Sequence, residues 1–97
     1  MQRGRRKNEV MLLCERHVTA LLIRILDSSG PVKLNDLSKI VTSYRTLKAL
    51  TDRMVKEGVI TKELEHLNYA TMFLELTPKG KDIAMKLKEA VNIFQCS

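Results

Sequence analysis

Hydrophobic residues repeat with a helical period through the first three apolar stretches of this 97-residue chain. From Val10 to about Leu26 they cover most of the helical circumference, which predicts a long first helix. Narrower stripes follow from about Asn35 to Val41 and from about Tyr44 to Glu57. They predict a short second helix and a longer third helix, both amphipathic.

The period then changes to the alternation that is typical of β-strands. Val59 to about His66 and Thr71 to Leu76 predict two strands, joined by a loop from Leu67 to Ala70. Thr77-Pro78 marks the start of a closing helix, because proline is favoured in a first helical turn. The apolar residues of that helix fall on one stripe, formed by Ile83, Leu87, Ala90, Val91 and Phe94, and we expect the helix to pack against a second subunit together with the first helix.

Breakers and capping residues set the predicted helix ends. The run Ser28-Ser29-Gly30-Pro31 interrupts the chain after the first helix. Asn35 or its neighbour can cap the second helix, and the hydroxyls of Thr42-Ser43 can accept hydrogen bonds from the first turn of the third. Gly58 suits the left-handed position that follows a helix end.

The third helix has two chemically distinct faces. Leu47, Leu50 and Met54 repeat at helical spacing and are predicted to pack inward. Arginine can fork onto guanine edges, lysine and threonine can reach phosphates or bases, and a helix N-terminus favours a phosphate. Groups of this kind dominate the other faces, which carry Tyr44, Arg45, Lys48, Ala49, Thr51 and Asp52.

The length predicts one domain over residues 10–97, preceded by a basic stretch over residues 1–9. The predicted first helix has more apolar surface than the core of a small domain covers, so we expect it to lie at a subunit interface. Arg3, Arg5 and Arg6 belong either to a solvated terminus or to a flexible arm. Such an arm would follow a phosphate backbone or enter a minor groove.

Composition favours a polyanionic partner. Seventeen Lys and Arg residues against eleven Asp and Glu residues give a formal net charge of +6. Glu15, Arg16 and Arg24 interrupt the longest apolar run, so none reaches the roughly 20 residues that span a bilayer. Because no small-residue cleavage site follows the basic N-terminus, we expect a cytoplasmic protein without a membrane partner.

Candidate chemistry is sparse. Cys14 and His17 share a helical face and His66 could join them, but no second ligand pair completes a zinc site, so we expect no metal or cofactor. Gly80-Lys81 lacks the surroundings of a P-loop, and no nucleophile lies beside a plausible base, so we expect no enzyme. Cys14 is expected in the core, while Cys96 either stays free or pairs with its copy in a second subunit.

Two motifs carry a resemblance to known regulators. Residues 43–62, SYRTLKALTDRMVKEGVITK, are similar to the recognition-helix region of the MarR, PadR and HxlR types of small transcription regulators. Residues 74–84, LELTPKGKDIA, look like the LTxKG run that closes the wing and opens the last helix in these families. The order of elements resembles the winged helix-turn-helix domain. It implies a mainly α, α+β fold with a small antiparallel β wing and an added C-terminal helix.

The resemblance also implies which residues meet DNA. It places the loop from Leu67 to Ala70 over a minor groove, but that loop lacks the Arg or Lys usual at a DNA-reading wing tip. Either the wing contributes little, or Lys62, His66 and Asn68 contact the backbone from its flanks. The residues placed at or near the major groove are Ser43, Tyr44, Arg45, Thr46, Lys48 and Ala49.

We therefore expect a sequence-specific, double-stranded DNA-binding transcription regulator that acts as a homodimer, most simply as a repressor. The resemblance also allows a small-molecule effector at the dimer junction, although no residue specifies one. The alternative is a winged helix that binds protein and does not read DNA. Such a module would expose an apolar stripe on the third helix, whereas the cations of that helix outnumber Asp52 and Glu57 and favour DNA.

Overall fold

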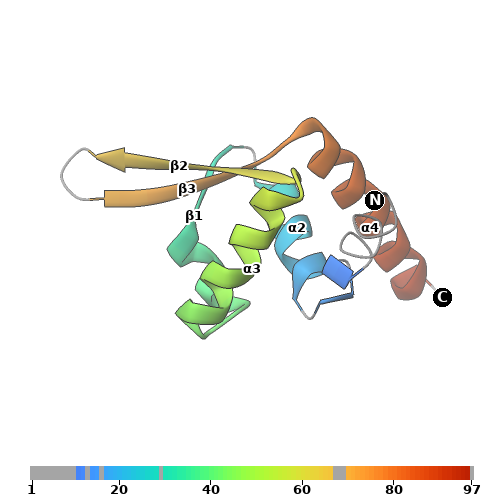
Figure 1. The fold of residues 1–97 in the computed structure, drawn as a ribbon. Helices are drawn as coiled ribbons and strands as arrows, with labels where there is room; N and C mark the ends of the chain where they lie inside the picture. The colour runs from blue at the N-terminus through green and yellow to red at the C-terminus, as the bar shows by residue number, and fades with distance from the viewer. Residues whose placement is uncertain (1–10, 13, 16, 29, 67–69, 97) are drawn as a thin grey trace.

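The computed structural model describes residues 11–12, 14–15, 17–28, 30–66 and 70–96. Three α-helices, one 3-10 helix and three strands are assigned within these residues. Figure 1 shows the β2–β3 hairpin projecting beyond the helices, with α3 slanting away below its base and α4 at the other end of the molecule. In chain order the elements are α2 (Val18–Asp27), β1 (Val32–Lys33), η1 (Leu34–Lys39), α3 (Tyr44–Lys56), β2 (Ile60–His66), β3 (Ala70–Leu76) and α4 (Pro78–Cys96).

The three strands form one antiparallel sheet in the order β1-β3-β2. Both predicted strands are confirmed, each within one residue of its expected start. Residue Leu74 of β3 pairs with Val32 on one side and with Lys62 on the other, so these three side chains share one face of the sheet. Val32 and Leu74 are buried, which identifies that face as the one toward the core.

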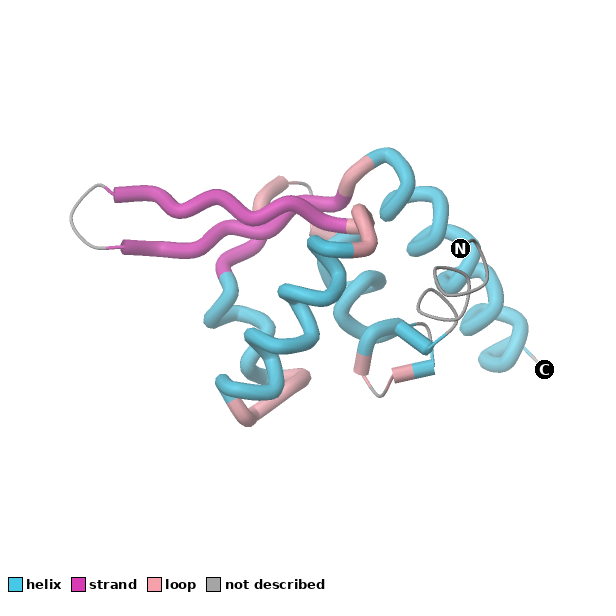
Figure 2. The backbone as a smooth tube through the Cα atoms, in the orientation of Figure 1, coloured by secondary structure: helices cyan, strands magenta, loops and turns pink. Residues whose placement is uncertain are grey.

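The core lies where α2, α3 and the inner face of the sheet meet (Figure 2). Its largest fully buried side chains are aliphatic, as the scarcity of aromatic residues requires. Helix α2 contacts both α4 and β3, so it occupies the centre of the molecule. The fully buried aliphatic residues include Val18, Leu21, Leu22, Leu37, Leu47, Met54, Ile60 and Leu74.

The predicted first helix is wrong in its continuity. His17 has a φ of 77°, in the left-handed region, and α2 begins only after it. Histidine enters this region more often than most residues with a Cβ atom do. Before this break, Leu12 is only 3% exposed and belongs to the core. Cys14, expected in the core, is exposed instead.

The predicted second helix is a single run of 3-10 structure, Leu34–Lys39. Its capping position is Lys33, whose side chain makes no capping hydrogen bond, so the expected cap at Asn35 or its neighbour is wrong. Six residues of 3-10 helix, which is wound more tightly than an α-helix, are enough to place Leu34 and Leu37 in the core.

The ends of α3 follow the predicted chemistry. The Ser43 hydroxyl accepts a hydrogen bond from the backbone N–H of Thr46 at 3.3 Å, and Gly58 has a φ of 78°. Beyond that glycine, the Thr77 hydroxyl donates to the carbonyl oxygen of Gly58 at 2.6 Å and accepts from the N–H of Gly80 at 3.0 Å. The Lys79 ammonium donates to the carbonyl oxygen of Glu57 at 3.2 Å. The first turn of α4 is therefore bonded to the end of α3.

The apolar stripe of the closing helix is only partly buried within the single chain. Ala84 is fully buried, whereas Leu87 and Val91 are half-buried. Ala90 and Phe94, farther along α4, are exposed in the single chain. In the described part of the chain, no helix is both long and apolar enough to cross a bilayer.

Candidate nucleic-acid interface

Helix α3 packs through one face and leaves the other in solvent. Its buried residues are Leu47, Leu50, Thr51 and Met54, and all of them except Thr51 belong to the helical repeat that the sequence predicts. The stripe opposite this buried set is formed by Arg45, Lys48, Ala49, Asp52 and Lys56, and every one of these residues is exposed. We call these five residues the outer stripe of α3.

The outer stripe is predominantly cationic. Within the described residues, Arg45, Lys48 and Lys56 have no acidic partner, so their charges remain available at the surface. Arg53 lies at the margin of this face and differs, because its guanidinium pairs with the Glu15 carboxylate at 2.8 Å. That ion pair joins α3 to the turn before α2.

The N-terminal end of α3 is also exposed. Ser43 caps the helix, and Tyr44 and Thr46 of the first turn are exposed, Tyr44 at 58%. The positive end of the helix dipole lies here, together with backbone N–H groups that can bind an anion. All six residues that the resemblance places near a major groove are therefore exposed on one continuous segment, namely Ser43, Tyr44, Arg45, Thr46, Lys48 and Ala49.

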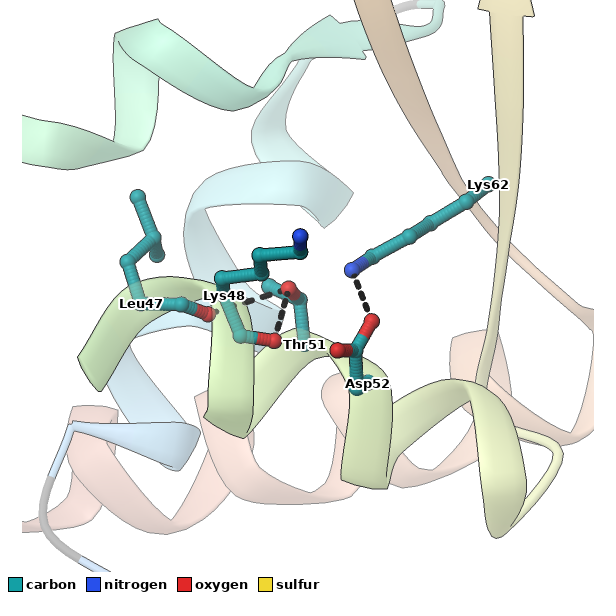
Figure 3. A network of polar contacts seen from close by, with 5 residues as sticks. All are labelled: Leu47, Lys48, Thr51, Asp52 and Lys62. Atoms are coloured by element: carbon teal, nitrogen blue, oxygen red, sulfur yellow. Dashed lines mark hydrogen bonds and ion pairs between the residues drawn. The ribbon is translucent and has the colours of Figure 1, made fainter. Parts of the chain in front are cut away.

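Thr51 does not belong to this exposed group. The residue is fully buried, and its hydroxyl donates to the carbonyl oxygens of Leu47 and Lys48, each at 3.0 Å (Figure 3). The predicted outward position of Thr51 is wrong because a threonine that bonds back to its own helix satisfies its hydroxyl and packs its methyl group in the core.

Lys62 lies on the core-side face of the sheet, in the same cross-strand row as Leu74. Its side chain is 13% exposed, and its ammonium pairs with the Asp52 carboxylate at 2.5 Å. Figure 3 shows the lysine reaching from β2 to the outer stripe of α3. The sequence singled out Lys62 but gave no sign of Asp52 as its partner, because the pairing depends on how the hairpin lies over the helix.

Several predicted positions lie outside the described residues. These are Asn68 in the hairpin loop and Arg3, Arg5 and Arg6 in the basic N-terminal stretch. His66 is the last residue of β2. Among the described residues, no group of three or more His, Cys, Asp or Glu side chains could hold a metal ion.

The elements and their order define a winged helix-turn-helix fold: α2, η1 and α3 form the helical part, and β1 with the β2–β3 hairpin forms the wing. The same fold is found in the reduced form of the transcriptional regulator YodB from B. subtilis. The two chains share 17% identity over 89% of this chain and 84% of that chain, with a TM-score of 0.67. No family model and no curated protein matches the sequence.

Proposed function

We propose that this chain is a homodimeric transcription regulator that binds double-stranded DNA sequence-specifically and represses by blocking polymerase access. The observation that carries the proposal is the exposed, predominantly cationic outer stripe of α3 on a rigid apolar support. A structurally similar protein is a transcriptional regulator, which supports the same conclusion. The fold alone does not decide function, so the proposal depends on this face.

In the proposed complex α3 lies in the major groove with its N-terminal half leading. Arg45 is suited to fork onto the O6 and N7 atoms of a guanine, because a guanidinium presents paired donors. Lys48 and the capped N-terminus at Ser43 would bind phosphates, which fix the register on the duplex without reading sequence. The wing would lie toward the neighbouring minor groove, with Asn68 near its tip, and the arginines of residues 1–9 would follow the backbone.

Exposed apolar side chains support the homodimer. Ile93 on α4 is 70% exposed, and Met85 and Phe94 of the same helix are also exposed. Met11, before α2, adds a further exposed apolar side chain. Burial of this surface between two copies would remove it from water, and a two-fold dimer would place two α3 helices about 34–36 Å apart, one turn of DNA.

The proposal is tested by selecting bound sequences from a random double-stranded DNA pool with the full chain, then measuring affinity for the selected site. Arg45→Ala should cost about 1–3 kcal/mol and relax base preference at one position. Lys48→Ala should weaken binding to all sequences by similar factors. Lys86→Ala is the matched control, because Lys86 is an exposed cation on α4, away from the proposed groove contact.

Two outcomes contradict the proposal. If no sequence is enriched and the chain has no affinity for duplex DNA, the DNA-binding function is wrong. If the selected site binds Arg45→Ala and Lys48→Ala as tightly as the unaltered protein, α3 is not the reading element.

A further inference from the structure

Asp52 is the only acidic residue within α3, and it lies in the middle of the outer stripe. Arg45 and Lys48 lie on its N-terminal side and Lys56 on its C-terminal side. The carboxylate is 59% exposed, so it faces any ligand that approaches this stripe. Against a polyanion, an uncompensated carboxylate at this position is repulsive.

Lys62 provides the compensating charge from a different element. Its register opposite Leu74 directs the side chain to the inner face of the sheet. The Lys62 side chain therefore starts on the sheet face that carries buried Val32 and Leu74, and its ammonium reaches Asp52 on α3, an arrangement that suits a long amphipathic side chain. The geometry fixes the ammonium at 2.5 Å from Asp52 and leaves 13% of the lysine side chain exposed.

We propose that Lys62 is a positioning residue for DNA recognition: it neutralises Asp52 and holds the wing against α3, and it does not itself bind a phosphate. The inference rests on the proposed function and assigns Lys62 a role different from the backbone contact that the sequence suggests. The ammonium already donates to Asp52 and only 13% of the Lys62 side chain is exposed, so little of it is accessible to a phosphate.

A double-variant cycle separates the two roles. The four proteins are the unaltered chain, Lys62→Met, Asp52→Asn and the double variant, because methionine keeps the apolar stem and asparagine keeps the shape of aspartate. Each is titrated with the DNA site selected by the unaltered protein. Lys62→Met alone should weaken binding roughly five- to tenfold, since it leaves an unpaired carboxylate against the phosphates. In the Asp52→Asn background the same change should alter affinity by less than about twofold.

Salt dependence provides a second, independent measurement. A phosphate contact contributes about 0.9 to the slope of log K against log salt. In the Asp52→Asn background, Lys62→Met should therefore leave the slope unchanged if Lys62 only positions, and should reduce its magnitude by about two per dimer if Lys62 binds phosphate. A purely structural loss would lower the urea midpoint of the variant without producing this pattern.

If Lys62→Met lowers the stability of the fold, a second variant tests the same ion pair. This charge-exchanged protein combines Asp52→Lys with Lys62→Asp. It should bind DNA more tightly than Lys62→Asp alone, because the ion pair is restored in reverse. The inference is overturned if Lys62→Met lowers DNA affinity by the same factor with Asp52 and with Asn at position 52. It is also overturned if the charge-exchanged protein binds DNA no more tightly than Lys62→Asp alone. These outcomes are distinct from failure of the proposed function, in which the unaltered protein itself would bind no duplex.

Discussion

A Cβ atom added to Gly80 would lie 1.9 Å from the carbonyl oxygen of Val59 and 2.9 Å from its carbonyl carbon. The first turn of α4 therefore touches the backbone that follows α3 with no room for a side chain. Because the obstructing atoms are main-chain atoms, they cannot rotate aside. This contact gives a physical reason for the glycine in the LTPKG run.

Gly80→Ala should accordingly destabilise the fold by at least about 1–3 kcal/mol, the usual cost of forced overpacking. Urea unfolding followed by circular dichroism measures the change. Gly30→Ala is the matched control, because a Cβ atom there meets nothing within 4 Å, and it should shift stability by less than about 0.5 kcal/mol. Equal stability of the two variants would show that α4 does not approach Val59 this closely.

Ser43→Ala should cost about 1 kcal/mol, because the Thr46 N–H loses its capping acceptor. Thermal unfolding detects this as a lower midpoint temperature. The neighbouring exposed residue supplies a control, and Thr42→Ala should have a much smaller effect. If Ser43→Ala and Thr42→Ala lower the midpoint temperature equally, the capping hydrogen bond at Ser43 does not explain the loss of stability.

Ile93→Glu should dissociate the proposed dimer, because a carboxylate would replace an apolar side chain that is 70% exposed in the single chain. Sedimentation equilibrium at tens of micromolar should find dimers for the unaltered protein and monomers for the variant. Gln95→Glu adds the same charge two residues later without removing an apolar group and should remain dimeric. A monomeric unaltered protein would contradict the dimer itself.

Binding to the selected DNA should depend steeply on salt. If the dimer neutralises about eight phosphates, log K should fall against log salt with a slope near −7. Lys48→Ala removes one cation per subunit and should bring the slope to about −5. Fluorescence anisotropy between low and moderate salt gives both slopes, and a slope near zero for the unaltered protein would exclude phosphate neutralisation as the source of affinity.

Local chemistry explains which parts of the fold were predictable from sequence. The cap at Ser43, the left-handed Gly58 and the start of α4 at Pro78 each depend on a few adjacent residues, and all three are found as expected. The predicted alternation of apolar and polar residues along both strands is also found, since one face of the hairpin contacts the core. These features position the outer stripe of α3 and so most of the candidate site.

The remaining features depend on contacts between distant residues. The chain breaks at His17, Leu12 lies in the core and Glu15 pairs with Arg53, and no local pattern around residue 17 requires this. The pairing of Lys62 with Asp52 likewise depends on the angle between hairpin and helix. Thr51 lies near the boundary between the two faces of α3, and its burial is decided by the hydroxyl's bonds to its own helix.

Hydrogen bonds from Thr77 to Gly58 and from Lys79 to Glu57 join the start of α4 to the end of α3, so we expect the two helices to tilt together. In a dimer held together by α4, a change in the crossing of the two C-terminal helices would then alter the separation of the two reading helices by a corresponding amount. Half-sites one base pair too near or too far could be matched only by deforming the duplex. In the proposed dimer, discrimination by operator length would follow from this junction.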